Sequence, residues 1–459
     1  MKLSKSEVRR KAHAILEIRF EKQEARTLTS FAGLALFQRF FAAIGLRRRL
    51  AACFATMGGG KIYSRTSGFL QLIVHLLLGF RELQDCRYYQ DDPLLQRVLG
   101  LRRLPDVATL SRMLKEATME SVARLRRLLR EMVLERLALL AATRVTLDFD
   151  GSVQSTRRHA EGTAVGFNKK KKGARSYYPL FCTVAQTGQV LDVLHRPGNV
   201  HDSNGALAFV IACVEAVRRE LPGVVLEVRM DSAFFSDELV AALTTARVEF
   251  TLSVPFERFA ELKGMIEQRQ VWCALDDETS YFEKSWKPQC WTRRYRFLFV
   301  RTKAKKQSKG PVQLDLFVPY EYGYEFKVIV TNKSVGPQAV ITYHEGRGSQ
   351  ESVFAELKSH CHVDYVPVRR LHGNQTYLLA GLFAYNLTRE LQMQTSHPSR
   401  RTTPQRATYW VFEKLDTIRK TVIQRAGRFS RPQGALTLTV SAGTWIRTRF
   451  QEILHALAA

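Results

Sequence analysis

The sequence has no apolar run long enough to cross a membrane. Its longest, FLQLIVHLLLGF at 69–80, is interrupted by Gln71 and His75 and is better interpreted as a buried helix. The first twenty residues mix charged and apolar side chains and lack the apolar region and cleavage site of a signal peptide. We therefore expect a protein of the cytoplasm with no membrane partner.

The cysteines are few and scattered. There are seven in 459 residues, an odd number, and no two are spaced as CxxC. This argues against a disulfide framework and against a structural zinc site. The HCH triplet at 360–362 is too compact to clamp a metal ion.

Acidic residues are scarce beside basic ones. Lys and Arg number 70 and Asp and Glu number 43, which gives a net charge of +27 and an isoelectric point near 10. Basic surfaces gain affinity for DNA or RNA by releasing counterions, so a polyanionic partner is the first expectation. The hydrophobic content of 45% is ordinary for a globular protein, and the length suits two to four domains.

The first part of the chain is predicted to be helical. Residues 1–143 form a helical N-terminal domain in this interpretation, with one helix starting behind Pro105 and Asp106. The Arg-rich stretch SVARLRRLLREMVLERLALL either contacts a nucleic acid or forms a solvated helix face, and the sequence leaves both open.

The pattern changes at residue 144. RVTLDFD alternates apolar and polar residues, as expected of a strand with one buried face, and the following segments predict the order β-β-β-α-β-α-β. This order indicates an α/β, ribonuclease-H-like domain with helices on its sheet. We assign its first part to 144–253, a β-rich insertion to 254–331, its second part to 332–395 and a basic C-terminal region to 396–459.

The second part contains an unusual helical segment, YHEGRGSQESVFAELK at 343–358. At about 100° per residue, Arg347, Glu351 and Lys358 fall within roughly 40° of one another on a continuous helix. Charge pairs at this spacing commonly support exposed helices, so the stripe is either a salt-bridged surface or part of an active site.

Three carboxylates occupy related positions. Asp150 ends the first predicted strand, Asp231 ends the fourth, and Glu351 lies on the helix after the insertion. The first and fourth strands are neighbours in a ribonuclease-H-like sheet, so we expect these side chains to converge, and they would repel one another without cations. Mg²⁺ suits such a site, and two ions about 4 Å apart suit phosphodiester chemistry. Asp148 shares the strand face of Asp150 and is the alternative first ligand.

These segments resemble those of a known family. LDFDGS at 147–152, RMDSAF at 229–234 and the 343–358 helix are similar to the three acidic motifs of DDE transposases from bacterial insertion sequences. Arg347, Glu351 and Lys358 match the R-x3-E-x6-K spacing of the Y-R-E-K group. GFNKKKKGARSYYPL, HRPGNVHDSNG and AYNL are most similar to the insertion-sequence 1380 subgroup, and the likeness covers roughly 144–390.

The resemblance implies a function. It implies a transposase that cuts at the terminal inverted repeats of its own element and joins the 3′ ends to target DNA, as a homodimer on DNA with two Mg²⁺ ions, or Mn²⁺ in their place. The N-terminal domain would bind the DNA ends, and the protein would be bacterial, cytoplasmic and associated with the nucleoid when bound. The catalytic and metal-binding residues would be Asp150, Asp231 and Glu351. Asp150 is preferred over Asp148 because Gly151-Ser152 resembles the family's Asp-Gly-Thr motif.

Several basic and aromatic residues are expected to contact DNA. Arg347 and Lys358 would hold phosphates, and Tyr343 joins them although it lies four residues before Arg347 where the group has three. The loop FNKKKKGARSYY at 167–178 is either a solvated loop or a phosphate-binding one, and its place after the first catalytic strand favours phosphate contact. Its basic residues are Lys169, Lys170, Lys171, Lys172 and Arg175. Trp286 and Trp291 in the insertion either pack in a core or receive a flipped base.

Two other functions fit the sequence less well. One is a catalytically inactive DNA-binding relict of a transposase, and the other is a stand-alone metal-dependent nuclease. The presence of all three carboxylates argues against the first, and the long insertion with basic flanking regions argues against the second.

Overall fold

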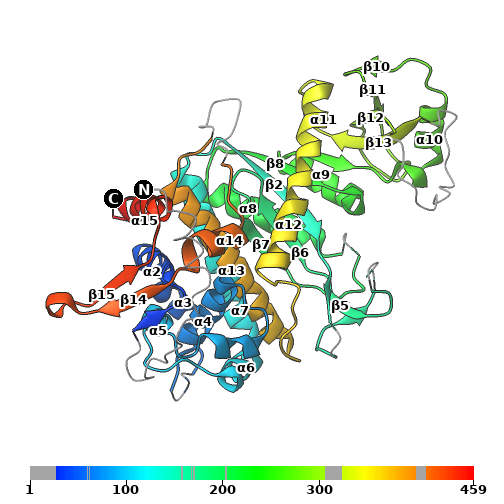
Figure 1. The fold of residues 1–459 in the computed structure, drawn as a ribbon. Helices are drawn as coiled ribbons and strands as arrows, with labels where there is room; N and C mark the ends of the chain where they lie inside the picture. The colour runs from blue at the N-terminus through cyan, green and yellow to red at the C-terminus, as the bar shows by residue number, and fades with distance from the viewer. Residues whose placement is uncertain are drawn as a thin grey trace, which may run out of the picture.

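The computed structural model describes residues 27–58, 60, 62–156, 159–166, 168, 171–201, 204–304, 323–399 and 410–458. A nine-stranded mixed sheet runs through the centre of the molecule in the order β10-β11-β12-β13-β9-β8-β2-β6-β7. Helices of the N- and C-terminal parts gather at one end of this sheet, and the insertion lies at the other (Figure 1). No helix among the described residues has both the length and the apolar character to cross a bilayer.

Five strands and two helices form the predicted α/β unit. They are β2 (Arg144–Gly151), β6 (Leu180–Val184), β7 (Val190–Leu194), α8 (Ala206–Glu220), β8 (Val225–Met230), α9 (Asp237–Thr245) and β9 (Glu249–Ser253). β2, β8 and β9 run parallel, whereas β6 and β7 run antiparallel to their neighbours. The strands therefore lie in the order third, second, first, fourth, fifth, which confirms the predicted ribonuclease-H-like fold.

The strand β2 has two buried faces rather than one. Val145, Leu147 and Phe149 face an apolar cluster that includes residues of α8 and α9. The alternating polar residues Thr146 and Asp148 are also buried. The expectation of a single buried face was therefore wrong, because a period of two shows which residues share a face but not what covers each face.

The insertion extends the same sheet. It contains η3 (Phe256–Arg258), α10 (Ala260–Glu267), β10 (Cys273–Ala274), β11 (Thr279–Trp286), β12 (Tyr295–Lys303) and β13 (Tyr324–Thr331). β13 pairs antiparallel with β9, with Thr331 opposite Thr251. The β-rich character is as predicted, but the segment VQLDLFVPY at 312–320, whose alternation indicates a further strand, lies outside the described residues.

The remaining helices form an apolar core from both ends of the chain. They are α2 (Leu34–Ala43), α3 (Leu46–Cys53), α4 (Arg65–Leu78), η1 (Leu83–Tyr88), α5 (Pro93–Leu99), α6 (Val107–Lys115), α7 (Met119–Leu139), α13 (Leu371–Thr395), α14 (Leu415–Ile418), η5 (Arg419–Ile423) and α15 (Thr444–Ala456). α13 packs on α4, α6 and α7. As predicted, the apolar run in α4 is buried, and α6 starts after Asp106, its N-cap, whose carboxylate accepts a hydrogen bond from Thr109 N at 2.8 Å.

Two small sheets complete the fold. β1 (Leu28–Thr29) pairs with β14 (Gly427–Ser430), which forms a hairpin with β15 (Thr437–Val440), so the two ends of the described chain meet. β3 (Gln154–Ser155), β4 (Ala164–Val165) and β5 (Arg175–Tyr177) form the second small sheet, between β2 and β6 in the chain.

Helix α13 packs closely against the backbone of α6 at Gly373. A Cβ atom at this position would lie 2.4 Å from the carbonyl oxygen of Leu114, a backbone atom that cannot turn away. We expect Gly373→Ala to lower the free energy of unfolding by about 1–3 kcal/mol through overpacking, measured by urea denaturation. Gly264→Ala is the control, because Gly264 lies in α10 with open space around it, and there alanine should stabilise by about 0.5–1 kcal/mol.

Candidate active site

Two of the predicted carboxylates end neighbouring strands. β2 and β8 are parallel, and Phe149 lies opposite Met230 in their register, so the next residues, Asp150 and Asp231, lie at the same edge of the sheet. Asp231 accepts a hydrogen bond from Ala233 N at 3.0 Å and thereby starts the short helix η2 (Ser232–Phe234). Asp150 accepts one from Gly151 N at 2.7 Å.

The third motif is broken into two helices. α11 (Pro337–Glu345) ends before the 3₁₀ turn η4 (Gly346–Gly348), and α12 (Ser349–His360) begins after it. The two follow one another along the sheet (Figure 1). The single helix expected over 343–358 was therefore wrong in detail, and Arg347 lies in the turn between the two helices.

The start of α12 rests on the end of β2. Gln350, which is almost fully buried, donates from Nε2 to the carbonyl oxygen of Asp148 at 3.0 Å. Arg347 Nη1 lies 3.5 Å from Asp150 Oδ2. Glu351 is exposed in the first turn of α12, next to Gln350 in the chain. The structure thus brings Asp150, Asp231 and Arg347 to one sheet edge, and Glu351 follows directly after the contact of Gln350 with β2.

The donor set at this edge fits Mg²⁺ in part. Across the described ranges, no three Asp, Glu, His or Cys side chains lie close enough to hold one metal ion together. Glu351 is thus not gathered with Asp150 and Asp231 in this conformation. Mg²⁺ is often bound through one or two carboxylates and completes its shell with water and phosphate oxygens, so Asp150 and Asp231 alone suit it.

Asp148 has a different environment from Asp150. Its side chain is 1% exposed and bonds both oxygens to Arg229, with Nε–Oδ1 at 2.6 Å and Nη2–Oδ2 at 2.7 Å. Asp150 keeps 22% of its side chain exposed. Burial alone would lower the pKa of Arg229, but the hydrogen bonds and charge of Asp148 raise that pKa above its ordinary value. These contacts favour Asp150 as the metal ligand, and the assignment stays a prediction.

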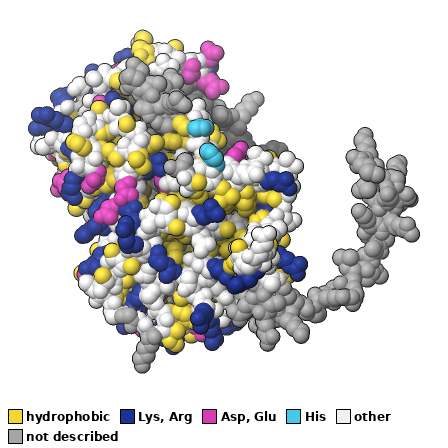
Figure 2. Space-filling view, turned by 90° about the vertical axis from the view of Figure 1, so that its left-hand side faces the viewer, with side chains coloured by type: hydrophobic (Ala, Val, Ile, Leu, Met, Phe, Trp, Pro, Cys, Tyr) yellow, Lys and Arg dark blue, Asp and Glu magenta, His cyan; other side chains and the backbone are white. Residues whose placement is uncertain are grey.

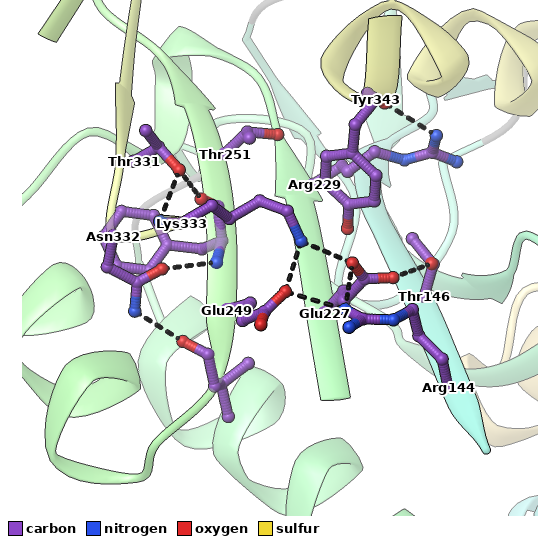
Figure 3. A network of polar contacts seen from close by, with 12 residues as sticks. Arg144, Thr146, Glu227, Arg229, Glu249, Thr251, Thr331, Asn332, Lys333 and Tyr343 are labelled. Carbon is purple, nitrogen blue, oxygen red and sulfur yellow. Dashed lines mark hydrogen bonds and ion pairs between the residues drawn. The ribbon is translucent and has the colours of Figure 1, made fainter. Parts of the chain in front are cut away.

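A charged cluster occupies the same sheet face, toward the start of β2. Arg144 Nη1 lies 2.6 Å from Glu227 and 2.7 Å from Glu249, and Lys333 pairs with both carboxylates. Thr146 donates to Glu227 at 2.9 Å. Figure 3 shows this cluster between the strands and the end of α11. Glu227 and Lys333 are thus buried with their charges paired, and the half-exposed Arg144 and Glu249 balance the remaining charge.

Tyr343 points into this cluster and not outward. Its ring lies over Lys333 Nζ at 4.4 Å and over the Arg229 guanidinium at 5.2 Å, and its hydroxyl is buried (Figure 3). Burial raises the pKa of Tyr343 well above its usual value, so the phenol stays neutral. The prediction that Tyr343 shares a helix face with Arg347 and Lys358 was wrong, because the Tyr343 side chain packs against Lys333 and Arg229 on the sheet side of the helix.

His344 ties α11 to β9. Its Nε2 lies 2.8 Å from Ser253 Oγ, and its Nδ1 lies 3.0 Å from Thr251 Oγ1. Burial lowers the pKa of His344 to about 3, so the ring is neutral at ordinary pH. His344, Arg229 and Gln350 are not among the residues predicted from the sequence. Arg229 could have been found, because it is two residues before Asp231 and therefore shares its strand face.

The other predicted DNA-contacting residues have separate positions. Lys358 is half-buried on α12, Lys171 and Lys172 are exposed, and Lys169 and Lys170 lie outside the described residues. Arg175 is half-buried, and its Nε donates to Thr163 Oγ1 at 3.0 Å. None of these placements tests DNA contact.

The two tryptophans of the insertion are core residues. Trp286 is buried and donates to Glu261 Oε2 at 2.7 Å. Trp291 is buried and stacks on Phe235 with 4.6 Å between ring centroids. Neither ring is presented to a base in this conformation.

The helical part carries a basic groove. It has a volume of about 740 Å³ and is lined by Arg87, Gln90, Arg103, Asp106, Val107, Ala108, Ser111, Arg112 and Lys115. The four basic residues are exposed, and none of them forms an ion pair with a carboxylate within the described part of the chain. Basic side chains are also spread over the face seen in Figure 2.

Three comparisons with known proteins give one family match and several distant structural likenesses. A family model described as "Transposase DDE domain group 1" matches residues 16–459. A piggyBac transposase synaptic complex with hairpin DNA is similar at 10% identity and a TM-score of 0.38, covering 93% of this chain and 84% of that one. A Mos1 transposase paired-end complex with left transposon end is similar at 14% identity and a TM-score of 0.18, covering 42% and 60%. No curated protein matches the chain.

Proposed function

The chain belongs to the family Transposase DDE domain group 1 and is a transposase, and from this premise we propose that it cuts DNA at the terminal inverted repeats of its own element and joins the 3′ ends to target DNA. The observation that carries the proposal is the meeting of Asp150 and Asp231 at one sheet edge, with Arg347 and the start of α12 beside them. The R-x3-E-x6-K spacing supports an element of the Y-R-E-K group, and the segments GFNKKKKGARSYYPL, HRPGNVHDSNG and AYNL support one similar to insertion-sequence 1380. We further propose that the protein is bacterial, cytoplasmic and on the nucleoid when DNA-bound.

The proposed chemistry is phosphoryl transfer at this edge. Asp150, Asp231 and Glu351 would hold two Mg²⁺ ions, or Mn²⁺ in their place, which when bound activate the attacking oxygen and stabilise the leaving one. In the first step, water attacks the phosphodiester and the element's 3′ oxygen leaves with a proton. In the second, that 3′-hydroxyl attacks a target phosphodiester, loses its proton and displaces the 3′ oxygen of the target strand, which leaves with a proton.

Arg347 has a specific part in this proposal. It lies 3.5 Å from Asp150 and partly neutralises a carboxylate beside Asp231. A DNA phosphate at the same edge offers the guanidinium a stronger, bidentate partner. If Arg347 moved from Asp150 to a DNA phosphate, it would bind the strand and at the same time leave Asp150 free to bind a metal ion. Lys358, further along α12, would hold a neighbouring phosphate.

The experiment uses purified full-length protein, Mg²⁺ and a labelled duplex that carries the inverted repeat flanking the gene. The proposed transposase releases the end and joins its 3′-hydroxyl to target DNA. A nuclease would cut without joining, and a relict would bind without cutting. Sizing of the protein–DNA complex by light scattering tests the expected homodimer, and a complex with one protein chain would contradict it.

The basic groove beside α6 is the proposed site for the DNA end. Arg112→Ala with Lys115→Ala should weaken binding of the inverted repeat, because each lost phosphate contact reduces the slope of log K against log salt by about 0.9. Binding measured by fluorescence anisotropy from low to high salt gives this slope. Arg219→Ala removes an exposed cation from α8 and should leave the slope unchanged. An unchanged slope in the double variant would exclude phosphate contact at these two residues.

A further inference from the structure

Arg229 joins three elements through one guanidinium. Nε and Nη2 bond the carboxylate of Asp148 on β2, and Nη1 donates to the carbonyl oxygen of Tyr343 near the end of α11 at 3.0 Å. Asp148 and Arg229 lie directly opposite each other in the register of β2 and β8. Their side chains are 1% and 7% exposed, so water does not compete for these bonds. The three bonds leave this guanidinium little freedom to move.

Gly346 permits the guanidinium to reach the helix. A Cβ atom at this position would lie 2.1 Å from Arg229 Nη1. All three nearest atoms to that Cβ belong to the Arg229 guanidinium, so this side chain alone limits the space. Any residue larger than glycine would push Arg229 away from α11. Gly348, two residues later in the same turn, has open space around it.

A second contact fixes the other side of the turn. Gln350 Nε2 donates to the carbonyl oxygen of Asp148, so Asp148 holds this helical segment directly through its main chain and, by way of Arg229, through its side chain. The two attachments, at Tyr343 and Gln350, flank Arg347. Glu351 follows directly after the second attachment. The position of Arg347 and Glu351 relative to Asp150 and Asp231 is therefore set by polar contacts to Asp148 and Arg229.

We propose that Asp148, Arg229 and Gly346 form a latch that holds the Arg347–Glu351 segment in register with the strand ends that carry Asp150 and Asp231. The latch residues are positioning residues and do not touch DNA. The proposal rests on the proposed transposase function. Its physical basis is that a displacement of a reacting group by about 1 Å can reduce a rate by about a hundredfold.

A purely structural role is the competing explanation, and a double variant separates the two. Replacement of a buried ion pair by apolar residues of similar volume often leaves stability unchanged or raised. In Asp148→Leu with Arg229→Met, we expect the melting temperature and the affinity for the DNA end to be kept. End cleavage should fall by about a hundredfold because the bond to Tyr343 is lost. A stable double variant with full cleavage activity would overturn the latch.

A double-mutant cycle tests the contact between Gly346 and Arg229. Gly346→Ala in the natural chain should reduce cleavage by about tenfold or more, because the new methyl group displaces Arg229. In the Asp148→Leu/Arg229→Met background the same substitution should have little further effect, because the displaced side chain is absent. Gly348→Ala is the matched control and should leave cleavage unchanged in both backgrounds. Equal losses from Gly346→Ala in both backgrounds would show that Arg229 is not the reason for the glycine.

Hydrogen exchange gives a readout that does not depend on catalysis. Amides at the start of α12 should exchange faster in the double variant and in Gly346→Ala than in the natural chain and in Gly348→Ala. If the natural chain neither cuts nor joins DNA, the proposed function fails and the exchange rates alone decide on the latch. Unchanged exchange rates in both latch variants would overturn it whether or not the protein is active.

Discussion

Asp231→Asn should abolish end cleavage and strand transfer while the protein continues to bind the DNA end. Asp231 lies at the sheet edge next to Asp150, and its amide replacement keeps the size and the hydrogen bond to Ala233 N but removes the negative charge. The loss should exceed the roughly 10- to 100-fold that removal of an outer partner of a metal ligand costs. The measurement is product formation on a labelled inverted-repeat duplex, together with binding by anisotropy.

Asp276→Asn is the matched control for this experiment. Asp276 also accepts a hydrogen bond from the amide two residues later, that of Glu278 at 2.9 Å, but it lies in an exposed turn of the insertion. The control should keep full activity. If the Asp231→Asn protein also cuts and joins DNA, Asp231 does not belong to the active site, and the proposed function loses its central residue.

Asp148→Ala and Asp150→Asn should differ in their effects on stability. Removal of Asp148 leaves the Arg229 charge buried without its partner, which should lower the free energy of unfolding by about 3–5 kcal/mol. Asp150 is partly exposed beside Asp231, so its neutralisation should change stability by only about 0.5 kcal/mol. Asp150→Asn should nevertheless abolish cleavage, because a ligand carboxylate is lost.

Urea denaturation and the cleavage assay distinguish the two aspartates. The natural chain and Asp276→Asn give the reference values for both measurements. A stable, inactive Asp150→Asn and a destabilised Asp148→Ala would assign the metal ligand to Asp150. A fully active Asp150→Asn would instead exclude Asp150, and an Asp148→Ala protein of natural stability would show that the Arg229 pair contributes nothing to folding.

Much of the architecture could be predicted because it depends on local patterns and general sheet rules. The alternation in RVTLDFD fixes which residues of β2 share a face, and the order of strands and helices fixes the ribonuclease-H-like sheet. The meeting of Asp150 and Asp231 follows from these two facts, since both residues end parallel neighbouring strands. Their function as metal ligands stays a prediction.

The surroundings of these residues could not be predicted in the same way. The helical spacing assumed one continuous helix, but the 3₁₀ turn at Gly346–Gly348 separates α11 from α12. Tyr343 is buried against Lys333 and Arg229. The sequence also allowed a separate insertion domain, whereas β13 adds to the edge of the central sheet at β9. Both outcomes depend on contacts between residues about 80 or more positions apart, such as Thr331 with Thr251 and Tyr343 with Arg229.

The sequence by itself therefore determined the sheet, the basic character of the chain and the edge at which two carboxylates meet. Only the tertiary structure decided that Asp148 is buried and paired with Arg229, and that the Arg347 guanidinium lies 3.5 Å from Asp150. It also decided that Arg229 packs against the backbone of Gly346, where a side chain would not fit. The reason is physical. Periodicity along a chain specifies which side chains share a face, whereas the partner of each polar side chain is chosen by what packs over that face and excludes water from it.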